Sequence, residues 1–430
     1  MSMIEGFGAS SIPTKTIRLK NVTLPCDEGV LIDVKQYLPH DANLTNYSTD
    51  YAFGKSLIED GKLRIFPEVV GEQVIAVTYL YDGGQRCMIT FKLLVNQNPK
   101  KLWGVNYPPS DSLFMKELYS TKSFRDDKIK YVAASRRGRI HEQAGTFRDD
   151  DFGFWANSEA GIYLLVVADG AGSAKYSREG SRRVVQSVMD YLSSKLVPSV
   201  WAKDGADESK DGKVAQMLVL AANKALTQLD AFCKAENQKP NAMEKYCLKD
   251  FSTTLLIAAL RITEDGARQI VSFSIGDGAI VWVEPGKSEL LCSPDDGEYS
   301  GQTRFLTTTS VWAKAATDWG AFRQERVFVK KVPAALAKTG FLVLMTDGVS
   351  DSFFETEVKL HDASLWDDFI LKDADVDVGE KSLKKILGLF DAKDAEKHLL
   401  SWLGFWSRGN HDDRTLSVLL PAKMEGAFRE

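Results

Sequence analysis

The stretch YLLVVADGAGSAKYS, residues 163–177, decides how the larger part of this 430-residue chain is expected to fold. Tyr163 to Ala168 form an apolar run of strand length, which predicts a buried strand. The run ends directly at Asp169-Gly170, a pair that is usually found in turns. An acidic residue at the end of a buried strand is costly, so its presence there indicates a role beyond turn formation.

The overall composition is that of an ordinary globular protein. Hydrophobic residues make up 44% of the chain and charged residues 26%, and the formal net charge is −5. This charge argues against the basic surface that nucleic-acid binding requires. No polybasic segment indicates a membrane anchor. We therefore expect neither a nucleic-acid partner nor a membrane association.

The cysteines and the first residues indicate a cytoplasmic location. The cysteine count is odd and no CxxC pair occurs, which favours reduced thiols over a disulfide framework or a zinc site. The start of the chain lacks the pattern of a signal peptide, and no apolar run approaches the ~20 residues that span a bilayer.

The periodicity of the sequence divides the chain into three parts. Residues 1–97 contain short alternating strands separated by turn residues, which predicts a small all-β module, a sandwich of immunoglobulin-like type. Residues 98–128 carry three prolines and are expected to be a linker. Residues 129–423 mix strands with long amphipathic helices, so the overall class is α+β. The β module is either a recognition module or a structural extension.

Acidic residues recur where the predicted strands of the last part end. Three strands finish in an Asp-Gly pair, and two further acidic groups lie next to strands. The five segments are LLVVADG (164–170), VSFSIGDG (271–278), FLVLMTDG (341–348), FRDDDF (147–152) and GNHDDRT (409–415). Carboxylates at strand ends can point into one shared cleft.

Electrostatics limits what such a cleft can contain. Two carboxylates ~4 Å apart repel each other by roughly 4 kcal/mol at an effective dielectric constant near 20. Several together therefore need protons or cations, and ligands that are all oxygen select Mg²⁺ or Mn²⁺ over zinc. For one Asp-Gly pair a simple turn is the better interpretation, but for the whole set a metal site is.

Six motifs in this order resemble the metal-dependent protein phosphatase family (PPM, type 2C), in particular a bacterial branch. The motifs are HEQAGTFRDDDF (141–152), VADGAGSAKYSREGS (167–181), FSTTLLIA (251–258), SIGDGAIV (274–281), MTDGVSD (345–351) and GNHDDRTL (409–416). The resemblance implies a four-layer αββα sandwich around two Mn²⁺ or Mg²⁺ ions, and leaves a third ion open. It further implies that metal-bound hydroxide attacks phosphoserine or phosphothreonine of a phosphorylated protein directly.

The resemblance also implies roles for individual residues. Asp169 matches the aspartate that bridges both ions, and Gly170 matches a carbonyl ligand. Asp347 and Asp412 match carboxylates on one ion. Either Asp149 or Asp150 matches the ligand of the second ion, since three successive aspartates permit a slip by one residue. Asp413 follows a metal ligand in the family pattern, and Asp277 matches a position that we interpret as structural, at a turn.

Two positions depart from the family pattern. Gly145 stands where many members have an arginine for the substrate phosphate, which leaves Arg139 and Arg148 as candidates for phosphate binding. Ala171 stands where some members have a histidine. We therefore expect His141 to be the group that assists catalysis, together with Asp150 and Asp169 and the ions.

Three functional interpretations remain open at this point. The first is an active protein serine/threonine phosphatase that opposes a cognate kinase. The second is a pseudophosphatase that binds phosphoproteins without turnover. The third is a phosphatase whose β module selects one partner, which is compatible with the first.

Overall fold

The computed structural model divides the chain into two compact units, Met1–Gly104 and Val105–Glu430. The residues that it describes are 14–26, 29–38, 43–59, 62–81, 85–203, 206–239, 244–293, 303–354, 356–376, 379–388 and 394–425. Each unit has its own hydrophobic core, and each is described separately below.

The regular elements among the described residues of the first unit are strands and short 3-10 helices. One sheet has the order β1 (Thr14–Pro25), β7 (Gln85–Asn96), β6 (Gly71–Tyr81) and β3 (Asn43–Asp50). The other has the order β2 (Val30–Asp33), β5 (Lys62–Pro67) and β4 (Gly54–Glu59). Alternate residues such as Leu63 and Ile65 are fully buried against Ile75 and Phe91. An all-β first unit is thus confirmed, whereas its immunoglobulin-like character stays a prediction.

The second unit contains two antiparallel sheets. The five-stranded sheet has the order β10 (Asp151–Asn157), β11 (Ile162–Ala168), β12 (Leu255–Ile262), β13 (Arg268–Ile275) and β16 (Val327–Val332). The six-stranded sheet has the order β15 (Lys287–Leu290), β14 (Ala279–Glu284), β17 (Phe341–Met345), β18 (Arg414–Pro421), β9 (Ile129–Arg136) and β8 (Tyr119–Arg125).

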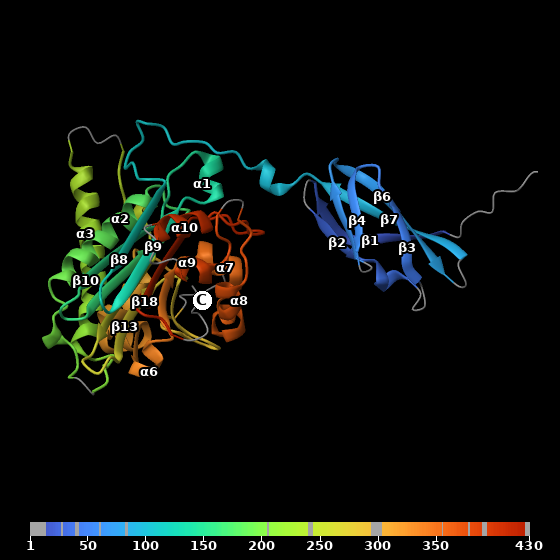
Figure 1. Cartoon of the computed structure of the whole chain (residues 1–430). Coiled ribbons are helices and arrows are strands. Elements are labelled where there is room, and N and C mark those ends of the chain that lie inside the picture. The colour runs from blue at the N-terminus through green and yellow to red at the C-terminus, as the bar shows by residue number, and fades with distance from the viewer. Residues whose placement is uncertain are drawn as a thin grey trace, which may run out of the picture. The chain divides into compact units, whose positions relative to one another are not determined.

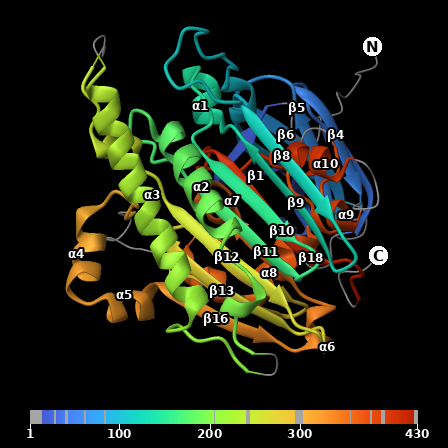
Figure 2. The ribbon, with the colours of Figure 1, turned by 90° about the vertical axis from the view of Figure 1, so that its left-hand side faces the viewer.

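Helices cover the outer face of each sheet. Over the five-stranded sheet lie α2 (Ser177–Ser193) and α3 (Lys213–Asn237), as Figure 2 shows, with α4 (Thr309–Thr317) and α5 (Trp319–Arg326) beside them. The other sheet is covered by α7 (Asp347–Phe354), α8 (Ala363–Leu371), α9 (Leu383–Gly388) and α10 (Ala395–Trp402) (Figure 1). The remaining described helices are α1 (Arg139–Ala144) and α6 (Ala334–Ala337).

Strand β11 shows why the unit has four layers. Leu164 and Val166 pack in the core beneath α2 and α3, while Leu165 and Val167 pack in a second core between the two sheets. Because successive side chains point to opposite faces, a strand buried on both faces reads as one continuous apolar run. A third core joins the six-stranded sheet to α7–α10. The predicted αββα sandwich is confirmed.

Most of the predicted linker, residues 98–128, belongs to the second unit in the structure. The second unit begins at Val105, and β8 pairs along its whole length with β9, for example Thr121 with Ala134. The sequence YSTKSFR gives a weak signal because β8 is an edge strand with an intermediate to exposed burial pattern. The second unit thus starts 24 residues before the predicted position 129.

Candidate metal and phosphate site

Acidic residues from strands of both sheets meet at one end of the sandwich. Asp169 follows β11, Asp277 follows β13, and Asp347 follows β17 as the first residue of α7. Oxygen atoms of these three carboxyl groups lie within 4.8 Å of one another. Asp150 directly precedes β10, and the charges of Asp150 and Asp347 both act on the carboxyl group of Asp169. The expected gathering of strand-end carboxylates is therefore present in the geometry.

The glycines that follow two of these aspartates allow a close approach of neighbouring chain. A Cβ atom on Gly170 would lie 2.8 Å from the carbonyl oxygen of Asp149. On Gly348 it would lie 1.9 Å from the carbonyl oxygen of Asp413. Glycine is thus required because another acidic segment packs against the backbone at each place. The close packing of a second acidic segment explains why glycine follows the aspartate at the ends of β11 and β17.

Burial and mutual repulsion keep these carboxyl groups from ionising freely. Burial, with the charges of Asp150 and Asp347, raises the pKa of Asp169 well above its usual range. Burial and the charge of Asp277 do the same to the pKa of Asp347. Burial and the charge of Asp413 raise the pKa of Asp150 to about 7. An unpaired buried charge is costly, so this arrangement favours bound cations.

Two oxygen atoms of the cluster have no hydrogen-bond donor among the described residues. They are Oδ1 of Asp150 and Oδ1 of Asp347, and both are buried. The other oxygen of Asp150 accepts hydrogen bonds from Oγ1 of Thr346, at 2.9 Å, and from Oγ1 of Thr415, at 2.7 Å. These threonines orient the carboxylate so that its open oxygen stays available. Carboxylate oxygens without donors are the ligands that a hard divalent cation takes.

A second group of candidate ligands consists of His141, Asp412 and Asp413. Nδ1 of His141 lies 2.9 Å from Oδ1 of Asp413, and Nε2 lies 3.7 Å from Oδ2 of Asp149. Asp413 also accepts hydrogen bonds from the backbone N–H groups of Gly138, at 2.5 Å, and of Asp149. Asp413 therefore ties its own segment to residues 138–149, which lie more than 260 residues earlier in the sequence.

The His141 and Asp413 pair is ionic. Burial alone would lower the pKa of His141, but the charge and hydrogen bond of Asp413 and the charge of Asp149 raise it to about 10. Burial would raise the pKa of Asp413, but the charge and hydrogen bond of His141 lower it below its usual range. At neutral pH His141 thus contributes a positive charge among the carboxylates.

Asp149 and Asp150 occupy different surroundings. Oδ2 of Asp149 accepts a hydrogen bond of 2.7 Å from Oγ of Ser177 and faces His141. The carboxyl group of Asp150 is fully buried beside Asp169. Of the two neighbours, Asp150 is therefore the one whose carboxylate lies in the cluster with an open oxygen.

The two arginines expected to bind phosphate make internal contacts. Arg148 is 2% exposed and donates hydrogen bonds to Oγ of Ser135, at 2.6 Å, and to the carbonyl oxygen of Asp150. Arg139 donates to the carbonyl oxygen of Gly404 at 3.3 Å and stacks over the ring of Trp406. The expectation for Arg148 differs from the structure, because a guanidinium buried in this way holds the backbone of Asp150.

Sequence reasoning missed the contribution of Lys116, which lies in the predicted linker. Its Nζ atom is 3.2 Å from Oδ2 of Asp151, and its side chain is 5% exposed. Burial lowers the pKa of Lys116 to about 8. No local pattern marks this lysine, because its partners lie more than 30 residues away. Asp277, for which the family pattern implies a structural role, lies with Asp169 and Asp347 and carries the same strand-end signal as Asp169.

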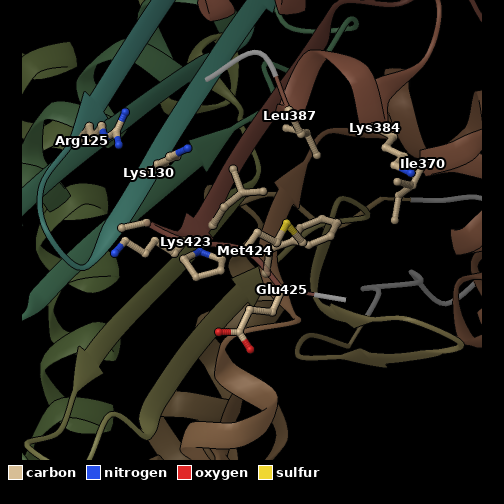
Figure 3. Close-up of a pocket in the computed structure, with 13 residues that line it drawn as sticks. Arg125, Lys130, Ile370, Lys384, Leu387, Lys423, Met424 and Glu425 are labelled. Carbon is tan, nitrogen blue, oxygen red and sulfur yellow. The ribbon is translucent and has the colours of Figure 1, made fainter. Parts of the chain in front are cut away.

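Two surface cavities are lined by residues other than the clustered aspartates. One, of about 710 Å³, is shown in Figure 3. It contains Lys130, Phe341 and Leu420, which occupy the opposite ends of β9, β17 and β18 from the acidic cluster. The other, of about 600 Å³, is lined by Arg136, Arg139 and Glu142 beside α1.

The sandwich and the acidic cluster place this chain in a class of proteins that have a carboxylate-rich centre at one end of two packed sheets. Within that class, the family model of protein phosphatase 2C matches residues 137–388, more than half of the chain. The chain therefore belongs to the protein phosphatase 2C family. Asp412 and Asp413 lie beyond the matched residues, so their place in the site rests on the contacts given above.

A relative by sequence and several solved structures are similar to this chain. The chain is 29% identical over 175 residues to serine/threonine-protein phosphatase 3 of Escherichia coli (strain K12). The match spans 40% of this chain and 59% of that relative's length, which is less than two thirds of it.

Solved structures with a similar outline include RsbX in complex with magnesium, at 12% identity and a TM-score of 0.36, covering 70% of this chain and 100% of that one. Another is the catalytic domain of PstP in complex with 2 manganese ions, at 16% identity and a TM-score of 0.39, covering 68% of this chain and 98% of that one.

Among the described residues, no helix is long and apolar enough to cross a membrane.

Proposed function

We propose that this protein is a metal-dependent protein serine/threonine phosphatase that removes phosphate from phosphoserine and phosphothreonine. The observation that carries the proposal is the buried cluster around Asp169, in which Asp150 and Asp347 each keep an oxygen without a donor. Family membership and the phosphatase relative support it. Its substrates are then phosphorylated proteins, and a serine/threonine kinase is its natural counterpart.

The residues that would hold the ions are Asp169, Asp150, Asp347 and Asp412, with the carbonyl oxygen of Gly170. We favour Asp150 over Asp149 because the latter already accepts a hydrogen bond from Ser177. When bound, Mn²⁺ or Mg²⁺ ions supply positive charge to a phosphate and acidify water. Asp277 adds a carboxylate to Asp169 and Asp347, which provides ligands for a third ion.

The remaining residues of the site orient and balance these carboxylates. Thr346 and Thr415 fix the rotamer of Asp150 through their hydroxyl groups. In the metal-free chain the charges of Asp413 and Asp149 raise the pKa of His141 to about 10, so its imidazolium would balance negative charge among the carboxylates. Arg139, which lines the cavity beside α1, remains the candidate for contact with the phosphorylated substrate.

The test is phosphate release from a phosphothreonine peptide in the presence of Mn²⁺. We expect release by the native chain, none with excess EDTA, and none from Asp169→Asn at unchanged melting temperature. Asp190→Asn is the matched control, because Asp190 is exposed on α2 and bonds only to the neighbouring turn through Gln186 in the contacts described. Full activity in excess EDTA would contradict the proposal. Peptide binding without release would instead support the pseudophosphatase.

We also propose a cytoplasmic location for this enzyme. None of the five cysteines, which all lie among the described residues, forms a disulfide, and four of them are buried. Reduced thiols of this kind are typical of the cytoplasm. Fractionation of cells that express the full chain tests this, and recovery in a secreted fraction would contradict it.

A further inference from the structure

A segment near the start of the second unit is hydrogen-bonded to the parts of the chain that lie next to the acidic residues. Residues 113–118, here called the strap, have no helix or strand structure. Carbonyl oxygens of the strap accept hydrogen bonds from arginines of two other segments. Arg178 donates to Leu113 and Phe114, at 2.7 and 3.0 Å, and Arg148 donates to Glu117 at 3.4 Å. The strap is thus held by the segments that carry the candidate ligands.

The backbone of Phe114, within the strap, has an unfavourable conformation for a residue with a bulky side chain. Its φ angle is 53°, and it is the one non-glycine residue with positive φ in the described part of the chain. For a bulky side chain this region is strained and persists only where surrounding contacts enforce it. The ring of Phe114 makes edge contacts with Tyr176, Phe232 and Phe251, which supply that enforcement.

The strained turn places Lys116 underneath the loop that carries Asp149 and Asp150. Its Nζ atom donates hydrogen bonds to the carbonyl oxygens of Asp149, at 3.3 Å, and Arg178, at 3.1 Å. It also donates to Oγ of Ser181 at 2.9 Å. One ammonium group therefore joins the acidic loop to helix α2, at the backbone of one acidic residue and the side chain of Asp151.

We propose that Lys116 is a positioning residue, which fixes the Asp149–Asp151 loop against α2 and thereby sets how well Asp150 and Asp169 hold an ion between them. The inference rests on the proposed function, since it assumes that these carboxylates bind metal. Lys116 itself contacts the backbone of Asp149 and the side chain of Asp151, and acts on the ion through that loop. Residues that orient metal ligands in this way typically change metal affinity by about 10- to 100-fold when they are replaced.

The experiment measures Mn²⁺ binding to the full chain by calorimetry and by the electron paramagnetic resonance signal of free Mn²⁺. Lys116→Met keeps the length of the side chain and removes its charge and donors. We expect one class of Mn²⁺ site to weaken by about 10- to 100-fold while the other keeps its affinity. The matched control is Lys122→Met, since Lys122 on β8 donates to the carbonyl oxygen of Phe154 in the same strand that Asp151 begins. The control should bind Mn²⁺ as the native chain does.

Each other outcome decides against the proposal. Native Mn²⁺ affinity in Lys116→Met, or an equal loss in both variants, would overturn it. Should Lys116→Met fail to fold, Lys116→Gln, which keeps a donor without the charge, replaces it. If neither folds, the lysine serves the fold and not the ions. If the native chain itself binds no Mn²⁺, the proposed function fails first, and that result is distinguishable from the others.

Discussion

Replacing Gly348 by alanine should disturb the site although it changes none of the candidate ligands. A Cβ atom there would lie 1.9 Å from the carbonyl oxygen of Asp413, and the neighbour is backbone, which cannot swing away. Real Cβ atoms essentially never come closer than 3.0 Å to another atom, so the gap must widen by about 1.1 Å. That displacement is large compared with the tolerance of hydrogen bonds to Asp413.

The expected losses of stability and turnover follow from the contacts that Asp413 makes with Gly138, His141 and Asp149. Overpacking of this kind costs about 1–3 kcal/mol of stability. A shift of 1 Å in a reacting group can reduce turnover by about 10²-fold. We therefore expect Gly348→Ala to lower the melting temperature and to reduce kcat/KM on a phosphothreonine peptide by about two orders of magnitude.

The assay compares Gly348→Ala with Gly172→Ala. A Cβ atom on Gly172 would meet no atom within 4 Å, and its backbone is not in the left-handed region, so this control should change stability by less than about 0.5 kcal/mol. Both are measured by thermal unfolding and steady-state kinetics with saturating Mn²⁺. Near-native activity and stability in Gly348→Ala would refute the view that Asp413 must stay where it is.

Three further predictions concern other parts of the unit. Because the pKa of His141 is raised to about 10, its protonation stabilises the folded state fully below its unfolded pKa of 6.5, and this contribution is lost as pH rises toward 10. In the metal-free chain, His141→Gln should therefore lose more free energy of unfolding at pH 6 than at pH 9.5, as urea titrations measure; an equal loss at both would contradict the ion pair. Because Ala171 has no proton to donate, kcat/KM across aryl phosphates should fall steeply as the leaving-group pKa rises, and a shallow slope would reveal another acid. A chain beginning at Val105 should keep the melting temperature and aryl phosphatase activity of the second unit, whereas one beginning at Asp126 loses the strap and β8 and should aggregate or fall in activity; equal behaviour of the two would show that the strap is dispensable.

Much of the second unit could be predicted because its signals are local. The apolar runs that end at Asp169 and Asp347 gave both the strands and the cluster, since a strand buried on both faces needs no partner to be recognised in sequence. The helix expected from residue 177 begins there in the structure, and the last strand was expected at RTLSVLL and is β18.

The features that were missed depend on contacts between distant segments. Lys116 resembles any lysine of a polar stretch until the fold brings Asp151 to it. Arg148 was assigned to phosphate binding because of its place beside the acidic motif, but the fold turns its guanidinium inward toward Ser135. Helices α4 and α5 were not predicted, since Asp318, the N-cap residue of α5, interrupts their periodicity.

The bonds of Asp413 have a consequence for how this protein is made on the ribosome. They reach back 275 residues to Gly138, 272 to His141 and 264 to Asp149. The strand that follows Asp413, β18, comes last in the sequence among the described strands. Contacts so far apart in sequence form late, after local structure. A nascent chain can complete its first unit and the five-stranded sheet before Asp413 is made. The six-stranded sheet, in which β18 lies between β17 and β9, and the acidic centre stay incomplete until residues 413–421 have been translated. Chains that stop before Asp413 are therefore expected to lack the phosphatase activity proposed above.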